Sequence, residues 1–281
     1  MSPLRQQMQN DMILHGLAER TQDAYLSAVI AIAKHFHRSP DQLSSDDIKA
    51  YLLHLINERH LSGSTTNQAG CALRFLFRVT LKQGDVNIEI PLRKIPSKLP
   101  QLLSREEVQD ILRACTNLRH RTLLTTAYAT GLRISELCQL KVNDIDSKRM
   151  MLRVVNGKGG KDRYTLLSPA LLANLRLYWQ AYQPKDWLFP NGDGAKPISQ
   201  SQILRFFYAA KRRANIHKQG GVHSLRHAFA THLLESGVDL HSISRLMGHD
   251  HISTTARYLH MQDKIVVNNS PLDLLSNLRL F

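Results

Sequence analysis

The chain has few cysteines and no long apolar stretch. Its three cysteines, Cys71, Cys115 and Cys138, lie far apart and form no C-x-x-C pair, so neither a disulfide framework nor a cysteine zinc site is expected. The longest apolar candidate, residues 122–132, is shorter than the roughly 18 residues of a membrane span. The N-terminus, MSPLRQQMQND, lacks the apolar region of a signal peptide. We therefore expect a soluble, cytoplasmic protein with no membrane association.

Acidic residues are scarce relative to basic ones. The 281 residues include 37 Lys and Arg but 23 Asp and Glu, a net charge of +14. Residues 1–100 carry a net charge of +3, whereas residues 101–281 carry +11. Such a surplus attracts polyanions, of which nucleic acid is the commonest inside cells. Charge alone would also suit a basic protein with solvated lysines, so it favours nucleic-acid binding without deciding it.

Helical periodicity dominates the first ninety residues. Thr21 is a candidate N-cap for a helix reaching about residue 36, and Ser44 with Asp47 resembles a capping box. Ser64 or Thr65 is expected to start another helix, whose apolar residues recur on one face. These patterns predict a small helical bundle over residues 1–90.

A proline-rich segment follows the bundle. Residues 91–100, PLRKIPSKLP, contain three prolines, three basic residues and no acidic residue. Proline lacks the backbone N–H and restricts the residue before it, so this composition disfavours both helix and strand. We expect an extended basic linker over residues 91–102, with a second domain over residues 103–281.

The second domain mixes helices with a short hairpin. Ser104 and Glu107 form a capping box ahead of its first helix. Strand-like residues 150–155 and 163–167 flank the glycine-rich NGKGG, which predicts a β-hairpin. Further helices are expected over residues 123–130, 134–140, 169–182, 199–214, 222–236, 239–247 and 252–260. The fold class is therefore mainly α with a small β component (α+β).

Four local patterns of the second domain contain reactive side chains. They are ATGLRISEL at 129–137, GKGGKDR at 157–163, HSLRHAFATH at 223–232, and LMGH at 246–249 running on to TTARY at 254–258. Each pattern is ordinary alone: Arg133 would suit a salt bridge at a helix end, and Tyr258 a half-buried core position. Together they supply, in this order, Arg133, Lys158, His223, Arg226, His249 and Tyr258.

In that order and spacing, the chain resembles the tyrosine recombinase (phage integrase) family, of the Xer-like or mobile-element type. The resemblance covers essentially the whole second domain, while the helical first domain resembles the family's DNA-clamping, core-binding half. It implies a site-specific recombinase or integrase that cleaves and rejoins double-stranded DNA through a 3′-phosphotyrosyl intermediate. It also implies a homotetramer on synapsed sites, and a monomer or weak oligomer otherwise.

The chemistry of these residues agrees with the resemblance. Attack on a phosphodiester concentrates negative charge on its nonbridging oxygens, which two guanidinium groups, Arg133 and Arg226, can bind bidentately. A tyrosine hydroxyl, with a pKa near 10, is a weak nucleophile until a base or cationic surroundings activate it. Tyr258 is the expected nucleophile, His223 the expected base, and His249 a hydrogen-bond donor to the phosphate.

Two of the remaining roles come from the resemblance. It places the acid that protonates the leaving 5′-oxygen at Lys158 rather than Lys161. Glu136 matches a position that supports the first arginine, although it would equally suit a surface carboxylate. Lys161 and Arg163 are expected to contact the DNA backbone or to be solvated. This chemistry needs no cofactor and no metal, and the sequence lacks H-E-x-x-H and Walker motifs.

Two histidines outside this set, His227 and His232, are expected to serve packing or capping, because their spacing puts them on different helix faces.

Two other function classes remain open, as does the role of the C-terminal tail. A type IB topoisomerase-like enzyme would use the same chemistry without exchanging partners, and a non-catalytic DNA-binding regulator would need no nucleophile. A metal-dependent transposase is a more distant third. After Tyr258, Leu272, Leu275 and Leu278 recur at helical spacing. So short a helix needs a docking site, either on its own domain or in a neighbouring protomer.

Overall fold

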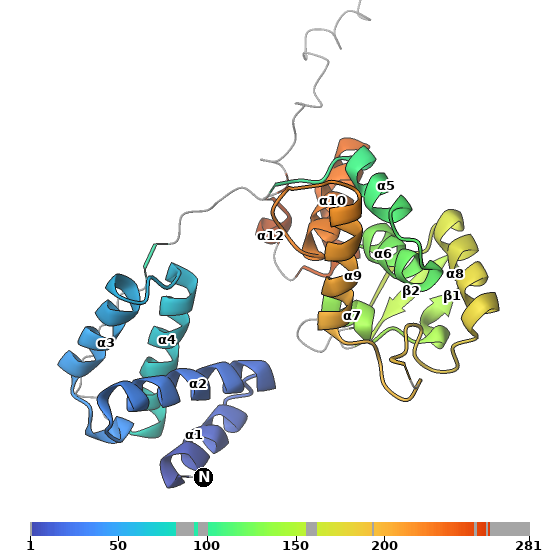
Figure 1. Ribbon diagram of the computed structural model, residues 1–281. Helices are drawn as coiled ribbons and strands as arrows, with labels where there is room; N and C mark the ends of the chain where they lie inside the picture. Colours follow the sequence, from blue (N-terminus) through green and yellow to red (C-terminus); the bar gives the residue numbers. More distant parts are fainter. Residues whose placement is uncertain are drawn as a thin grey trace, which may run out of the picture. The chain divides into compact units, whose positions relative to one another are not determined.

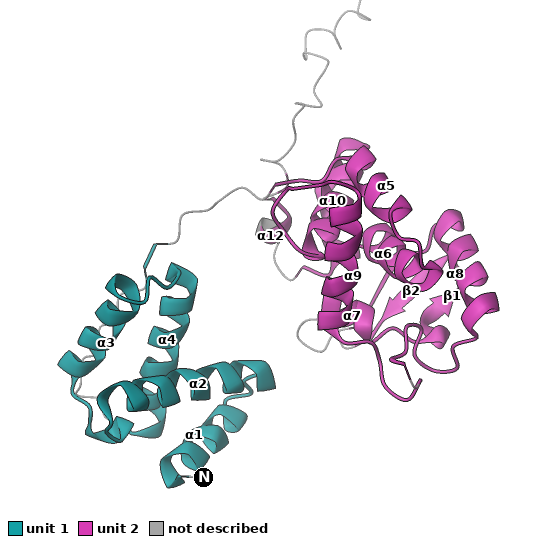
Figure 2. Cartoon of the chain, in the orientation of Figure 1, with its two compact units in different colours: residues 1–98 teal, residues 99–281 magenta. Residues whose placement is uncertain are grey.

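The computed structural model describes residues 2–82, 93–94, 101–155, 162–192, 194–249, 252–256 and 258 (Figure 1). The chain divides into two compact units, residues 1–98 and residues 99–281 (Figure 2). Each unit has its own apolar core. No helix among the described residues is long and apolar enough to cross a membrane.

The first unit is helical in its described part. Its elements are α1 (Pro3–Leu14), α2 (Glu19–Phe36), a 3₁₀ turn (Pro40–Gln42), α3 (Ser45–Asn57), α4 (Gly63–Phe75) and a π-helical turn (Leu76–Thr80). Their apolar faces meet in a core that includes Met12, Ile32, Ile48 and Leu73, all buried. Burial of these faces stabilises helices that would be marginal alone in water.

The helix starts of the first unit agree only in part with the sequence prediction. The capping box at Ser44 is confirmed, because the backbone N–H of Ser44 donates to Asp47 Oδ2 at 2.9 Å. The other two predicted starts were wrong, because α2 begins at Glu19, before Thr21, and α4 begins at Gly63. There Ser62 is the N-cap, and its hydroxyl accepts from the backbone of Thr65. At α4, Ser62, Ser64 and Thr65 all suit an N-cap, so the pattern leaves a choice among them. At α2 the N-cap is Ala18, which makes no side-chain cap bond, so no capping residue marks that start in the sequence.

The second unit packs helices around a small sheet. Its helices are α5 (Arg105–Arg113), α6 (Leu118–Thr130), α7 (Ile134–Cys138), α8 (Pro169–Tyr182), α9 (Gln200–Arg213), α10 (His223–Glu235), α11 (Leu240–Met247) and α12 (Ile252–Ala256). The capping box at the start of α5 is confirmed, with Ser104 as N-cap and Glu107 at its third residue. Helix α10 packs against α5, α6 and α11, and strand β3 packs against α6 and α11. The fold class predicted from the sequence, mainly α with a small β component, is confirmed.

The sheet contains the predicted hairpin and one further strand. Strands β2 (Met151–Val154) and β3 (Arg163–Leu166) pair antiparallel, with Leu152 opposite Thr165. A 3₁₀ turn (Val142–Asp144) leads into β1 (Ile145–Asp146), which pairs with β2 on its other edge. Strand β1 was not predicted, because two residues are too few for a detectable alternation. Residues 156–161, which include Lys158, lie outside the described residues.

Both described ends of the predicted linker are attached to the unit they adjoin. The Asn67 side chain on α4 accepts from the Arg93 N–H at 2.8 Å and donates to the Arg93 carbonyl at 3.0 Å. In the second unit, the Leu102 carbonyl accepts from Lys218 Nζ at 2.7 Å. Residues 95–100 lie outside the described residues, as does the tail helix expected after Tyr258.

Candidate active site

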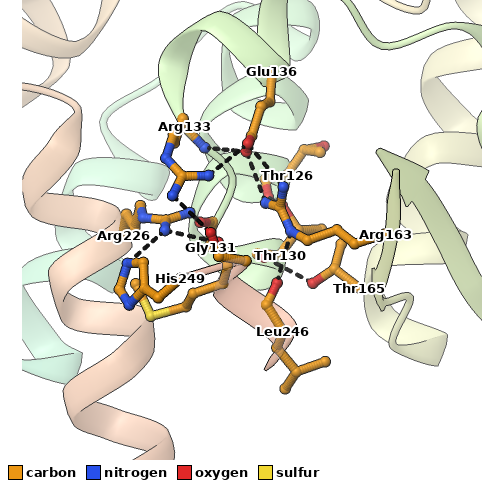
Figure 3. Close-up of polar contacts among 12 residues, drawn as sticks. Thr126, Thr130, Gly131, Arg133, Glu136, Arg163, Thr165, Arg226, Leu246 and His249 are labelled. Atoms are coloured by element: carbon orange, nitrogen blue, oxygen red, sulfur yellow. Dashed lines mark hydrogen bonds and ion pairs between the residues drawn. The ribbon is translucent and has the colours of Figure 1, made fainter. Parts of the chain in front are cut away.

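Arg226 lies in the first turns of α10, and its guanidinium is buried among backbone carbonyls. Nη1 donates to the Gly131 carbonyl at 2.5 Å, and Nη2 donates to the Met247 carbonyl at 2.8 Å. Only 2% of the residue is exposed. Burial, and then the charge of Arg133, lowers its pKa to about 10, so Arg226 remains protonated at neutral pH. These bonds hold a cation where α6 ends, α10 begins and α11 ends (Figure 3).

Arg133 is the N-cap of α7 and forms the second cationic group of the site. Its backbone N–H donates to Glu136 Oε2, and its Nη1 to Glu136 Oε1, each at 2.8 Å. Its Nη2 donates to the Gly248 carbonyl at 2.8 Å. Glu136 therefore supports Arg133, as the resemblance implied, and is not a surface carboxylate. Burial opposes its ionisation, but bonds from Arg163 and Arg133 outweigh this and lower its pKa to about 2.

Arg163 corrects an expectation drawn from the sequence. Its Nη1 and Nη2 donate to the two carboxylate oxygens of Glu136, each at 2.8 Å, and its side chain is 12% exposed. It is therefore neither solvated nor directed toward a surface. The β alternation contained the signal: Arg163 and buried Thr165 lie on the same face of β3, the face directed inward.

His249 follows Gly248, the C-cap of α11, and contacts Arg226. Arg226 Nη2 lies 2.9 Å from His249 Nε2, and the Thr255 hydroxyl lies 2.7 Å from His249 Nδ1. Burial, and then the charges of Arg226 and Arg133, lowers the pKa of His249 to about 4. A guanidinium N–H can only donate, so the neutral imidazole accepts at Nε2 and donates from Nδ1 to Thr255. The sequence pattern showed no role for Thr255.

Tyr258 lies two residues beyond α12, with its hydroxyl beside an imidazole. The residue is 4% exposed and belongs to an apolar cluster that includes Phe229, Ile243 and Met247. Its hydroxyl and His227 Nδ1 share a hydrogen bond of 3.0 Å. Sequence reasoning gave His227 a packing role and missed this contact.

His223, the histidine expected to be the base, is the first residue of α10 and is exposed. Its ring meets that of His227 edge to face, with centroids 4.7 Å apart. Partial burial, and then the charges of Arg226 and Arg133, lowers its pKa. The N-terminus of α10 adds a partial positive charge at the same place. The site thus combines guanidinium groups, a helix N-terminus and neutral imidazoles, an arrangement suited to an anion.

The close approach of α6 and α10 requires glycine at position 131. Gly131 ends α6 with φ +62°, and a Cβ there would lie 2.3 Å from Cδ1 of Phe229. Its carbonyl is one of the Arg226 acceptors. The glycine that precedes Arg133 in the sequence motif therefore serves packing as well as backbone conformation.

The structure brings five of the six expected site residues into one region, at the ends of α6, α7, α10, α11 and α12. The sixth, Lys158, lies outside the described residues, as does Lys161. The remaining motif histidine, His232, is buried with its Nδ1 2.8 Å from the Tyr128 hydroxyl, which fits the packing role expected of it.

Comparisons with known proteins give these observations a context. Residues 101–264 match the phage integrase family, and residues 4–84 match the phage integrase N-terminal SAM-like domain. A protein of Sinorhizobium fredii (strain NBRC 101917 / NGR234), y4qK, bears the name integrase/recombinase. It is 46% identical over 98% of this chain and 90% of its own length. Tyrosine recombinase XerC of Lactobacillus delbrueckii subsp. bulgaricus is 34% identical over 79% of each chain.

Solved structures show the same fold. The XerH site-specific recombinase bound to a palindromic difH substrate, in a post-cleavage complex, aligns with a TM-score of 0.72. That alignment has 23% identity and covers 88% of this chain and 78% of that one. A lambda integrase tetramer bound to a Holliday junction aligns with a TM-score of 0.75 and 19% identity, over 91% and 76% of the two chains.

Proposed function

The chain belongs to the phage integrase family and is a site-specific tyrosine recombinase, an enzyme that cleaves and rejoins DNA strands. On that premise we propose that Tyr258 is its nucleophile and that Arg133 and Arg226 bind the scissile phosphate. The environment of Arg226 carries this proposal. Among the described residues, the hydrogen-bond partners of this buried cation are two carbonyls and an imidazole, and none is a carboxylate. Burying a charge without an opposite charge is costly, so a bound phosphate would complete the site.

In the proposed reaction, the Tyr258 oxygen attacks the phosphorus and the bond from phosphorus to the 5′-oxygen breaks. A 3′-phosphotyrosyl link forms, and the charge that develops on the nonbridging oxygens is stabilised by Arg133 and Arg226. The phosphotyrosyl bond retains the energy needed to rejoin the strand. Lys158 is the proposed donor of the proton that the leaving 5′-oxygen requires.

The hydroxyl proton of Tyr258 needs an acceptor. His223 was the candidate from sequence, but among the described residues His227 lies at hydrogen-bond distance from the Tyr258 hydroxyl, at 3.0 Å. We assign proton acceptance to this pair of histidines, with His227 as the immediate acceptor and His223 beside it. His249 would orient Arg226 through Nε2. To donate to the phosphate it would need its other tautomer, with the Thr255 hydroxyl donating to Nδ1.

The first unit and the assembly complete the proposal. Each unit binds the duplex, the helical unit as the core-binding domain and the second as the catalytic domain, on either side of the basic linker. Strand exchange joins two duplexes, and four protomers would supply the four active sites that this requires. The tetrameric state described for lambda integrase on a Holliday junction supports that stoichiometry.

A nicked suicide substrate tests the nucleophile. Wild-type protein should give a protein–DNA adduct that survives denaturant, because the nick releases the fragment needed for resealing. Tyr258→Phe should bind the same DNA and give no adduct. Tyr164→Phe is the matched control, since Tyr164 is an exposed tyrosine on β3. An adduct that persists in Tyr258→Phe and maps to Tyr164 would overturn the assignment.

A further inference from the structure

Arg163 makes more contacts than a surface residue of a strand needs. Besides its two bonds to Glu136, its Nε donates to the Leu246 carbonyl at 3.2 Å. One guanidinium therefore joins β3 to α7 and to the last turn of α11. All three contacts lie on the donor edges of a single planar group (Figure 3).

The carboxylate that Arg163 binds is shared with Arg133. Glu136 Oε1 accepts from both Arg163 Nη1 and Arg133 Nη1, each at 2.8 Å. Glu136 Oε2 accepts from Arg163 Nη2 and from the Arg133 backbone, also at 2.8 Å. The Glu136 side chain is only 4% exposed. Its orientation is therefore set from two sides, and the orientation of the Arg133 guanidinium follows from it.

The second anchor of Arg163 lies beside the turn that precedes His249. Gly248 has φ +62°, and a Cβ there would lie 2.6 Å from Cδ of Arg163. The Gly248 carbonyl accepts from Arg133 Nη2 at 2.8 Å. The glycine of the Gly-His motif thus leaves room for the Arg163 stem, while its carbonyl holds Arg133. Arg163 and Arg133 contact the same turn from different directions.

We propose that Arg163 is a positioning residue for strand cleavage: it holds Arg133 in place through Glu136 and holds the turn at residues 246–249 through the Leu246 carbonyl. It acts without touching the phosphate itself. This inference rests on the proposed function, since it concerns the arginine that would bind the phosphate.

Arg163 also affects the charge of the site. Arg133, Arg163 and Glu136 together carry a net positive charge, which favours binding of a phosphate. If Arg163 were absent, the charge of Glu136 would cancel that of Arg133. Lysine cannot replace Arg163 fully, because a single ammonium cannot present the same planar set of donors to Glu136 and Leu246 together.

The test separates DNA binding from cleavage. For Arg163→Met we expect the Kd for nicked DNA to stay within about threefold, while the rate of adduct formation falls about 10²-fold or more, the effect of losing one well-placed donor. The rate of adduct formation in Arg163→Lys should lie between that of Arg163→Met and that of the wild type. Arg153→Met is the matched control: Arg153 lies on β2 and pairs with buried Asp144 at 3.5 Å, away from Glu136. Its adduct rate should match that of the wild type.

A double-mutant cycle asks whether Arg163 acts through Glu136. If it does, Arg163→Met combined with Glu136→Gln should be little slower than the slower single variant, because both remove the same arrangement. If the rate loss in the double variant equals the product of the two single losses, the inference is overturned. An unchanged rate in Arg163→Met would overturn it too. A matching loss of DNA affinity would instead show that Arg163 contacts DNA.

Thermal unfolding distinguishes positioning from general destabilisation. The rates of adduct formation are compared at a temperature where every variant is folded. If Arg163→Met does not fold, the rate is measured in Arg163→Lys, which keeps a positive charge opposite Glu136. A wild-type rate in the lysine variant would overturn the inference. If the wild-type protein binds DNA but forms no adduct, the proposed function fails, and this inference fails with it.

Discussion

The hydroxyl of Tyr258 and Nδ1 of His227 are 3.0 Å apart, although 31 residues separate them in the chain. His227 is one helical turn beyond His223, on the helix that also carries Arg226. The residue proposed to attack DNA therefore contacts the same helix that carries Arg226, one of the two arginines proposed to bind the phosphate. Both His223 and His227 are therefore candidates to accept the Tyr258 proton, and substituting each in turn distinguishes them.

We predict that His227→Gln slows adduct formation more than His223→Gln does. Glutamine can still hydrogen-bond to Tyr258 but cannot accept a proton at neutral pH, and loss of general-base catalysis costs about 10²–10⁴ in rate. Single-turnover rates of adduct formation at pH 7.5 are the measurement. A slower reaction in His223→Gln than in His227→Gln would make His223 the acceptor.

Arg226→Lys is expected to slow cleavage by at least about 10²–10³-fold. Cleavage by the wild type is expected to be insensitive to EDTA. The lysine keeps a charge but cannot reach Gly131, Met247 and His249 at once, and one strong transition-state donor is worth this much. Adduct yield measured with and without EDTA checks both statements. Complete inhibition by EDTA that is reversed by Mg²⁺ would contradict a metal-independent reaction.

We expect the free energy of unfolding to fall as pH decreases from about 6.5 toward 4. His249 has a pKa of about 4 in the folded protein, while an unfolded imidazole titrates near 6.5, so the unfolded state binds protons first. The loss is at most about 1.4 kcal/mol per pH unit for each such histidine. The lowered pKa values of His223 and His232 act in the same direction.

Urea unfolding at several pH values between 7.5 and 4.5 measures this slope. Glu136, whose pKa is about 2, contributes to acid destabilisation only below about pH 4.5, where an unfolded glutamate takes up its proton. The histidine effect is therefore separated from it. His249→Gln should have a shallower slope; an unchanged slope would show that His249 titrates alike in both states.

Deletion of residues 270–281 tests the proposed tetramer. If the leucine-rich tail docks in a neighbouring protomer, the deletion should leave binding to a single site nearly intact while lowering synaptic assembly and recombination. Gel shifts on one site and on paired sites, together with recombination yield, are the measurements. An unfolded deletion variant would instead indicate docking on its own domain, and unaffected recombination would exclude both roles.

Local sequence determined the elements whose stabilising partners are close in the chain. The capping boxes at Ser44 and Ser104 were predictable because the donor and acceptor lie three residues apart. The hairpin was predictable because two alternating runs flank a glycine-rich turn. The order and spacing of the reactive residues along the chain were sufficient by themselves to indicate the family.

Tertiary structure alone decided which of those residues touch. The Arg226 guanidinium binds a carbonyl 95 residues away, Arg163 binds a carboxylate 27 residues away, and Tyr258 meets His227 rather than His223. Strand alternation indicates that Arg163 is directed inward, but no helical or strand period indicates which residue any of these side chains contacts. These contacts depend on how the ends of α6, α7, α10 and α11 pack, because only packing brings donors and acceptors so distant in sequence within 3 Å of each other.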